Sequence, residues 1–460
     1  MSAALLKPEL DELIEKKAWI TIKDALQEVP AVDIAELLEE MEPEVAVVIF
    51  RLLKKVKAAD VFSYLSTAKG IELLEIFSRE QLSDVMNNLE PDERVALMEE
   101  LPGDLTQRLF SLMDPEGIKQ VRRLLGYPAE SVGRLMTTNY VKIKKDWTVE
   151  KSFEHIRKFG RTAETVNVIY VVDEDEKLID DLKITQLIVA DSEATISDVM
   201  DYNFEALSAF DDQEEAVRML SKYDRIALPV VDSGGILVGI VTVDDVLDVA
   251  EEETTEDMQL MAGMSALSKT YSETSMGDMV NKRIGWLIIL FLGQMLTVTA
   301  MAGFEDTLAA AAVLALFIPM IISSGGNSGA QAATLIIRAI STDDISMGDW
   351  FRVFRKEFMS GLLLGLIIGF LGTIVIGFWM FIRGEPFSLA LGLQALTVGL
   401  SLVGVVLFGN MSGSMLPFIM QKLGLDPAVT SAPFVATLVD ATGIFIYFSI
   451  AVALLRGVVL

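Results

Sequence analysis

The chain has no cysteine and a single histidine, His155, among its 460 residues. Without cysteine it can form no disulfide, iron–sulfur cluster or cysteine-ligated zinc site, and it has no thiol nucleophile. One histidine excludes histidine-rich metal sites and most serine–histidine hydrolases. Basic residues are also scarce, 38 against 66 acidic ones. Because Lys and Arg supply most of the affinity for phosphates, a net charge of −28 argues against nucleic-acid partners.

Apolar residues make up 52% of the chain and charged residues 23%, and the two kinds are unevenly distributed. Residues 1–282 carry a net charge of −27, whereas residues 283–460 carry −1. At this length we expect two to four domains. The sequence therefore predicts a large acidic soluble part followed by a membrane part. The polar, periodic first thirty residues predict no signal peptide.

Five long uncharged runs follow Arg283, each longer than the roughly 20 residues that cross a bilayer core. They predict five membrane-spanning helices, and the second and fourth runs are long enough to contain breaks. Most basic residues of this half fall on one side of the predicted membrane, which places the soluble part in the cytoplasm and Leu460 outside the cell. The runs cover residues 284–304, 307–337, 358–382, 386–421 and 427–455, the last interrupted only by Asp440.

Glycines and polar residues interrupt these runs. Gly361, Gly365 and Gly369 share one helical face, which favours close helix packing. The segment SSGGNSGAQAATLIIRAI places Asn327 and Gln331 four residues apart, on one face of a helix. Two interpretations stay open for this pair: hydrogen bonds between helices, or a polar pore lining.

Asp440 is the one acidic residue inside a predicted span, with thirteen uncharged residues before it and fifteen after. An ionised side chain at mid-bilayer costs at least about 2.5–3.5 kcal/mol, and no Lys or Arg lies mid-span to neutralise it. The sequence therefore favours a cation site over a protonated structural Asp, and carboxylate oxygen suits Mg²⁺, Ca²⁺ or Mn²⁺. A two-fold axis along the pore would supply Asp440 twice. Ala436, one turn earlier, could add a backbone carbonyl to a hydrated ion.

An internal repeat runs through residues 131–250. RLMTTNYVKIKKDWTVEKSFEHIRKF (134–159) parallels DVMDYNFEALSAFDDQEEAVRMLSKY (198–223), and each copy predicts strand, helix, strand, turn, strand and helix. The repeat resembles a tandem pair of CBS domains. Thr242 and Asp245 have the Thr-x-x-Asp spacing that such domains often use for an adenosine ribose, whereas Thr185 of the first copy has no matching Asp. Regulatory ATP binding and a purely structural dimerisation pair both stay open.

Residues 1–130 are helical and repetitive in pattern, because LLEEMEPEVAVVIFRLL (37–53) parallels VMNNLEPDERVALMEEL (85–101) at an offset of 48. The acid excess of the soluble part suggests a sensor: facing carboxylates repel one another unless cations lie between them. Residues 251–282 predict an amphipathic connecting helix with a short linker. The candidate clamp residues are Asp92, Asp212, Asp224, Asp245, Asp248, Glu253, Glu256 and Asp257.

The order of these parts, with GGNSGAQAATLIIRAI and VATLVDATG, resembles the MgtE-type magnesium transporters over essentially the whole chain. The resemblance implies an all-α helical-repeat N-domain (1–130), an α/β tandem CBS pair (131–250), a connecting or plug helix (251–282) and a five-helix transmembrane domain (283–460). It implies a homodimer in the cell membrane, with a pore lined by the second and fifth spans. It also implies Mg²⁺ influx, gated closed by cytosolic Mg²⁺.

The resemblance further assigns roles to single residues. It implies that Asp440 is the main pore ligand and that Ala436 offers its carbonyl. Ala96 and Ala432 stand where it implies polar side chains. The sensor positions that it implies are Asp92, Asp212, Glu214, Asp224, Asp245, Asp248, Glu253, Glu256 and Asp257.

Three alternatives to a Mg²⁺-gated Mg²⁺ channel are open from the sequence. A CBS-regulated anion channel is disfavoured because the charged mid-span residue is acidic. A proton- or cation-coupled carrier of Mn²⁺ or Co²⁺ would use Asp440 as a relay. A membrane-bound enzyme with Mg²⁺ as cofactor lacks a clustered nucleophile and base, so no enzymatic activity is expected.

Overall fold

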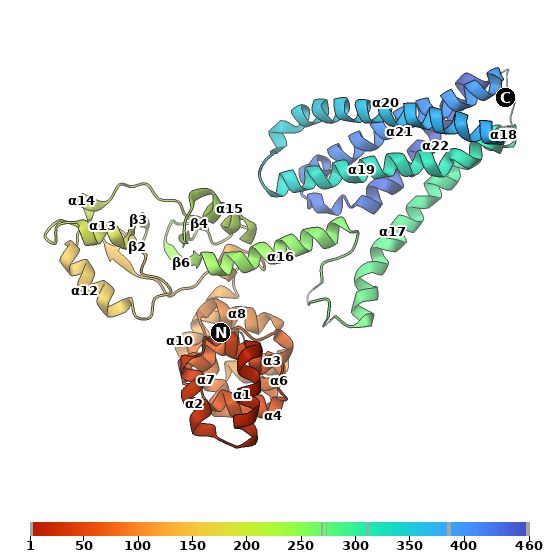
Figure 1. Ribbon diagram of the computed structural model, residues 1–460. Coiled ribbons are helices and arrows are strands. Elements are labelled where there is room, and N and C mark those ends of the chain that lie inside the picture. Colours follow the sequence, from red (N-terminus) through yellow and green to blue (C-terminus); the bar gives the residue numbers. More distant parts are fainter. Residues whose placement is uncertain (1–2, 268–269, 273, 311, 384–387, 457–460) are drawn as a thin grey trace. The chain divides into compact units, whose positions relative to one another are not determined.

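A series of short helices builds the N-terminal part of the chain in the computed structural model, which describes residues 3–267, 270–272, 274–310, 312–383 and 388–456 (Figure 1). Alternate helices pack on one another, α3 on α5, α5 on α7 and α4 on α6. The helices are α1 (Ala3–Glu15), α2 (Trp19–Glu28), α3 (Ala31–Glu39), α4 (Pro43–Leu52), α5 (Lys55–Ser63), α6 (Thr67–Ile76), α7 (Arg79–Asn88), α8 (Pro91–Glu100), α9 (Gly103–Phe110) and α10 (Pro115–Leu124).

Local chemistry explains where these helices begin. Pro43, Pro91 and Pro115 each occupy the first helical position, where a missing N–H costs nothing. The side chain of Ser66 caps α6 and that of Asp114 caps α10. Because α4 and α8 begin 48 residues apart, the structure confirms the helical repeat.

Two small three-stranded sheets follow, one in each copy of the internal repeat. The strand orders are β1-β2-β3 and β4-β5-β6; the first pair of each sheet is parallel and the second antiparallel. The α/β CBS-like order is confirmed. The strands are β1 (Lys142–Lys144), β2 (Val168–Val172), β3 (Leu178–Lys183), β4 (Leu207–Ser208), β5 (Ala227–Val231) and β6 (Leu237–Thr242). The helices are α11 (Val132–Leu135), α12 (Val149–Phe159), α13 (Ile184–Val189), α14 (Ile196–Val199), α15 (Gln213–Tyr223) and α16 (Val243–Met261).

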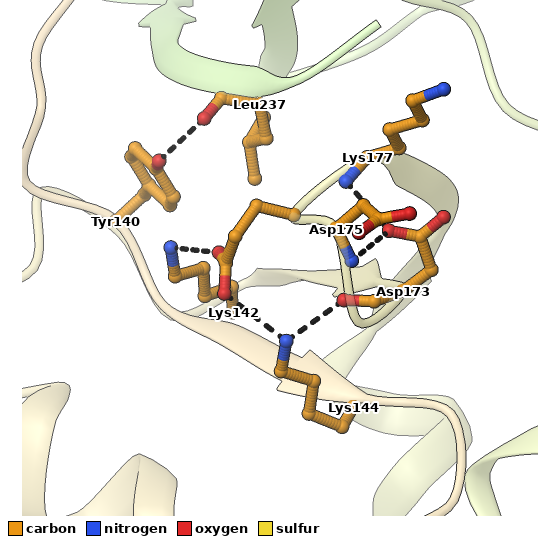
Figure 2. A network of polar contacts seen from close by, with 8 residues as sticks. Tyr140, Lys142, Lys144, Asp173, Asp175, Lys177 and Leu237 are labelled. Carbon is orange, nitrogen blue, oxygen red and sulfur yellow. Dashed lines mark hydrogen bonds and ion pairs between the residues drawn. The ribbon is translucent and has the colours of Figure 1, made fainter.

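The two copies are joined along their β-turns. The Tyr140 hydroxyl donates to the Leu237 carbonyl at 3.0 Å (Figure 2). Backbone bonds from Leu178 to Gly235 and from Leu237 to Glu176 close the same junction. Figure 2 also shows Lys144 of β1 reaching the turn at Asp173, to whose carbonyl it donates at 2.8 Å. The turn that precedes β3 is therefore held by both copies.

The N-terminal helices share a hydrophobic core with the second CBS copy. Val95 of α8 lies in the same cluster of buried side chains as Met136 and Val241. An ion pair between Arg134 and Glu99 and a hydrogen bond from Asn139 to Glu90 lie beside this core. Residues up to Glu251 accordingly form one unit, and Glu252–Leu460 form another.

Five helices of the second unit are long and apolar enough to cross a membrane, within the described residues: Met276–Ala302, Val313–Ser341, Met347–Trp379, Leu389–Lys422 and Ala432–Leu455. The second predicted run is broken, into α18 (Glu305–Ala310), the 3₁₀ helix η1 (Ala312–Phe317) and α19 (Ile318–Ser341). The fourth, α21 (Leu389–Lys422), is continuous, and its predicted start at residue 386 lies outside the described residues. The other elements are α17 (Met276–Ala302), η2 (Met347–Asp349), α20 (Trp350–Ile382), η3 (Pro427–Val429) and α22 (Ala432–Leu455).

Glycines set the spacing of α19, α20 and α21. A Cβ on Gly409 would lie 2.2 Å from the Gly325 carbonyl oxygen, and one on Gly413 would lie 2.0 Å from that of Gly329. On α20, a Cβ on Gly369 would lie 2.5 Å from the Gly399 carbonyl oxygen. These helices therefore approach backbone to backbone, as small residues allow in membranes.

Replacing Gly409 by alanine should destabilise the membrane unit, because the new methyl group meets a backbone atom that cannot rotate away. Overpacking of this kind costs typically about 1–3 kcal/mol. We expect a lower midpoint of thermal unfolding in detergent micelles for Gly409→Ala. Gly392→Ala on the same helix is the control, since no atom lies within 4 Å of its added Cβ. Equal midpoints for both variants would contradict the close approach.

Candidate cation sites

Asp440 lies on α22, nine residues after the Ser431 cap that starts the helix. Its side chain is half-buried, and its Oδ2 accepts a hydrogen bond from Gln294 Nε2 of α17 at 3.0 Å. Among the described residues it has no Lys or Arg partner. An amide can orient a carboxylate but cannot neutralise its charge. Asp440 is thus a carboxylate in a membrane-spanning helix that meets an amide and no basic side chain among the described residues.

Ala436 and the polar pair of α19 lie on the same two packed helices. Gly326 of α19 faces Ala436 of α22, since a Cβ on this glycine would lie 3.5 Å from the alanine Cβ. Asn327 and Gln331 are exposed, while Ser328 is buried and donates to Asn410 at 3.4 Å. In one chain, therefore, Ser328 makes the contact between helices, and the Asn327–Gln331 face lies open.

A group of carboxylates gathers between the start of α8 and the start of α16. Asp92 and Asp245 lie within electrostatic reach of one another there, and the Thr242 hydroxyl donates to Asp245 at 2.7 Å. Burial raises the pKa of the Asp92 carboxyl, and repulsion by Asp245 raises it further. Burial likewise raises the pKa of Asp245 to about 6. The Asp92 Oδ1 atom is enclosed and accepts no hydrogen bond from any described residue.

Sequence reasoning missed one member of this group, Glu164 in the loop between α12 and β2. The Glu164 N–H donates to the Asn139 carbonyl at 2.8 Å, and Asn139 in turn binds the Glu90 carboxylate. Burial, followed by repulsion from Glu90 and Asp245, raises the pKa of Glu164 to about 7. No periodicity marks this loop, so only its place in the fold identifies it.

The remaining sensor candidates of α16 lie farther along the helix. Asp248 is exposed, and Glu253, Glu256 and Asp257 are half-buried. Burial raises the pKa of Asp257, which accepts a hydrogen bond from Ser341 Oγ at 2.9 Å. Repulsion by Asp426 raises it further, so Asp257 and Asp426 lie within electrostatic reach of each other. Asp426, just before η3, was not predicted.

The candidates on α15 have local roles in this chain. Asp212 caps the helix by accepting the Glu214 N–H at 3.0 Å, and the exposed Asp224 ends it in the left-handed conformation, with φ 50°. Asp212 and Asp224 flank the 11-residue helix, which separates their backbone positions by roughly 18 Å. The chain therefore does not bring these two carboxylates together. Ala96 is exposed on α8, and Ala432 begins α22.

No three Asp, Glu or His side chains converge as a metal-binding group within the part of the chain that is described. The Asp440 site thus offers one carboxylate, and the carboxylates near Asp92 repel one another without converging on one point. Mg²⁺ usually keeps several waters and binds one or two carboxylates, so this donor set suits a hydrated Mg²⁺ ion.

Comparisons with known proteins agree along the chain. Residues 318–450 match the MgtE family, described as a divalent cation transporter. Residues 29–130 match the MgtE intracellular N domain, and residues 132–193 and 196–252 each match a CBS domain. The magnesium transporter MgtE of Thermus thermophilus is 40% identical over 464 residues, covering 98% of this chain and 99% of the relative. The chain belongs to the MgtE magnesium transporter family.

Other relatives extend the comparison. The magnesium transporter MgtE of Bacillus subtilis is 31% identical over 437 residues, covering 92% of this chain and 94% of the relative. A crystal structure of the cytosolic domain of the Mg²⁺ channel MgtE, in complex with ATP, is 35% identical with a TM-score of 0.51. It covers 53% of this chain and 100% of that domain. The predicted family and fold are confirmed, and the family is one of transporters rather than enzymes.

Replacing Glu164 by glutamine should stabilise the protein at high pH. The folded pKa of about 7 lies above the ordinary 4.5, so folding takes up a proton between these values and stability falls as pH rises. In divalent-free buffer we expect an apparent midpoint higher by roughly 1–4 °C at pH 8 and no difference near pH 4. The exposed Glu174→Gln is the control. A gain for Glu164→Gln that is independent of pH would contradict the assignment.

Proposed function

We propose that this chain mediates Mg²⁺ influx as a homodimeric channel that closes when cytosolic Mg²⁺ binds its acidic soluble part. The observation that carries this is Asp440, a carboxylate in a membrane-spanning helix whose described partner is a neutral amide. The family membership supplies magnesium as the cargo.

The pore would form on a two-fold axis between two copies. One chain offers a single mid-span carboxylate, and two copies would place two around one hydrated ion. The exposed Asn327 and Gln331 of α19 would line the same path, and the Ala436 carbonyl would help to hold the ion's water. A helix carbonyl has a second lone pair beyond its intrahelical bond, which makes that role chemically sound.

The soluble part would act as the sensor through charge repulsion. Asp92 of the N-domain and Asp245 of the second CBS copy repel each other when no cation lies between them. Mg²⁺ at this place would remove the penalty and hold the N-domain against the CBS pair. Further ions would bind separately at Asp248, Glu253, Glu256 and Asp257 of α16 and at Asp212, Glu214 and Asp224 on or beside α15, and would thereby bias the pore toward closure.

Regulation by ATP is a further part of the proposal. The cytosolic domain of a homologue was crystallised with ATP, and Thr242 and Asp245 hold the spacing expected for a ribose. Because Asp245 would also meet Mg²⁺, nucleotide and cation binding would be coupled there. The Lys and Arg distribution places the N-terminus in the cytoplasm and the C-terminus outside; Leu460 itself lies outside the described residues.

Asp440→Asn and Asp440→Ala should reduce Mg²⁺ flux into liposomes by at least about tenfold, because each removes the pore's negative charge. Flux is measured with a Mg²⁺ indicator inside the vesicles. Asp306→Asn, at an exposed acid outside the long helices, is the control and should keep normal flux.

Undiminished flux in both Asp440 variants would remove this residue from the mechanism. An imposed pH gradient tests the alternative in the same vesicles. Flux that follows the pH gradient would identify a proton-coupled carrier with Asp440 as relay; flux that follows only the Mg²⁺ gradient and membrane potential supports the channel.

Millimolar Mg²⁺ should slow protease cleavage of the soluble part of the full-length protein. The double variant Asp92→Asn, Asp245→Asn should lose this protection, since it no longer carries the facing charges. Asp146→Asn, an exposed acid of the first CBS copy, should keep it. Digestion patterns that are identical with chelator and with Mg²⁺ in the unmodified protein would reject the clamp.

A further inference from the structure

The first turns of α20 extend beyond the length that a bilayer needs. The helix has 33 residues, roughly 50 Å at 1.5 Å per residue, against a hydrocarbon core of about 30 Å. Its uncharged run begins only at Phe358. The excess therefore falls largely on the residues from Trp350 to Glu357, which would lie at the level of the lipid headgroups.

Aromatic rings follow one another along this segment. Trp350 contacts Phe351 with ring centroids 5.6 Å apart, and Phe351–Phe354 and Phe354–Phe358 follow at 6.4 Å each. All four side chains are exposed, Phe351 by 61%. Tryptophan and tyrosine gather where membrane-spanning helices cross the interface between hydrocarbon and water, and Trp350 is of this kind, while the three phenylalanines suit the adjoining hydrocarbon. This arrangement indicates that these side chains anchor the helix at the membrane interface and are not part of a hydrophobic core.

Cations lie among these rings. Arg352, Arg355 and Lys356 are exposed, and with Phe351 and Met359 they line a surface hollow of about 480 Å³. Arg352 is paired with Asp349.

The nearby acid Glu357 is engaged by another helix, because Asn410 of α21 donates to its carboxylate at 2.8 Å. Arg355 and Lys356 therefore have no carboxylate partner in the described chain. In a protein of net charge −28, these two adjacent exposed cations are therefore available to bind an external anion.

We propose that this surface, formed by Phe351, Arg352, Arg355, Lys356 and Met359 at the start of α20, binds the phosphate headgroup of an anionic phospholipid. The cations would hold the phosphate while the apolar side chains contact the upper acyl chains. Free phosphate in water would use the cations but leave the aromatic row exposed, so the mixed chemistry favours a lipid. The lipid would belong to the cytoplasmic leaflet, and this assignment rests on the membrane orientation in the proposed function. Lipid binding itself does not depend on ion conduction.

The test measures phospholipid retained by the full-length protein in detergent, by native mass spectrometry, during titration with phosphatidylglycerol or phosphatidylcholine. Two surface cations contribute about 1 kcal/mol each toward anionic lipid, so Arg355→Gln, Lys356→Gln should weaken phosphatidylglycerol binding about thirtyfold. Phosphatidylcholine retention should stay unchanged. Added salt should weaken the binding of the unmodified protein toward that of the variant, because exposed charges are screened.

Two matched variants separate charge from fold. The exchange Arg355→Lys, Lys356→Arg keeps both charges and should retain phosphatidylglycerol. Arg383→Gln removes a cation at the other end of α20 and should retain it too. Equal phosphatidylglycerol binding by the double Gln variant would overturn the proposal. An equal loss of both lipids would also overturn it. Loss of the dimer mass would overturn it too, because it would identify a protein interface. If inorganic phosphate displaces no lipid, the result supports a lipid site over a phosphate site.

Discussion

A carboxylate inside a membrane must be compensated, and the described contacts of Asp440 do not neutralise its charge. Asp440 meets an amide from α17 instead of a cation, although arginines and lysines flank the helices at their ends. Backbone contacts at Gly325–Gly409 and Gly329–Gly413 hold α19 and α21 tightly together, and α22 packs on both. In the proposed function, a mobile cation would supply the charge that compensates Asp440.

The soluble unit is subject to the same constraint, because it too holds buried carboxylates whose negative charges lack compensation. Asp92 and Asp245 come from different domains, yet a shared apolar core that includes Val95 and Val241 holds those domains against each other. Hydrophobic contact pulls the domains together while carboxylate repulsion opposes it. Because these two free energies act against each other, cation binding as proposed above would shift their balance. Protonation of Glu164 near neutral pH removes one of the repelling charges, as the proposed cation would compensate them.

The sequence predicts these features unevenly, for physical reasons. Periodicity and uncharged runs are strong over long helices, so the repeats at Pro43 and Pro91 and the five spans could be predicted. The ends of the helices could not be predicted, since α20 begins eight residues before its uncharged run. Gln294 could have been predicted as a polar contact, because it is the one amide side chain in the first uncharged run. Glu164 and Asp426 could not be predicted, because loops have no sequence periodicity. Only the fold brings Glu164 near Asp245 and Asp426 near Asp257.

The described chain presents polar groups that it does not itself complete. Asn327 and Gln331 are exposed on a helix whose other face is packed, and the residues of α17 are without exception partly or largely exposed. Polar side chains in a membrane find water or another protein surface, because lipid offers them no hydrogen bonds. If α17 faced lipid alone, Gln294 would have to satisfy its amide through Asp440 permanently, and that would fix the carboxylate against ion passage. In the proposed dimer, a second copy that brings a hydrated path to this face would free both groups, and the dimer would then be required for conduction as well as for stability.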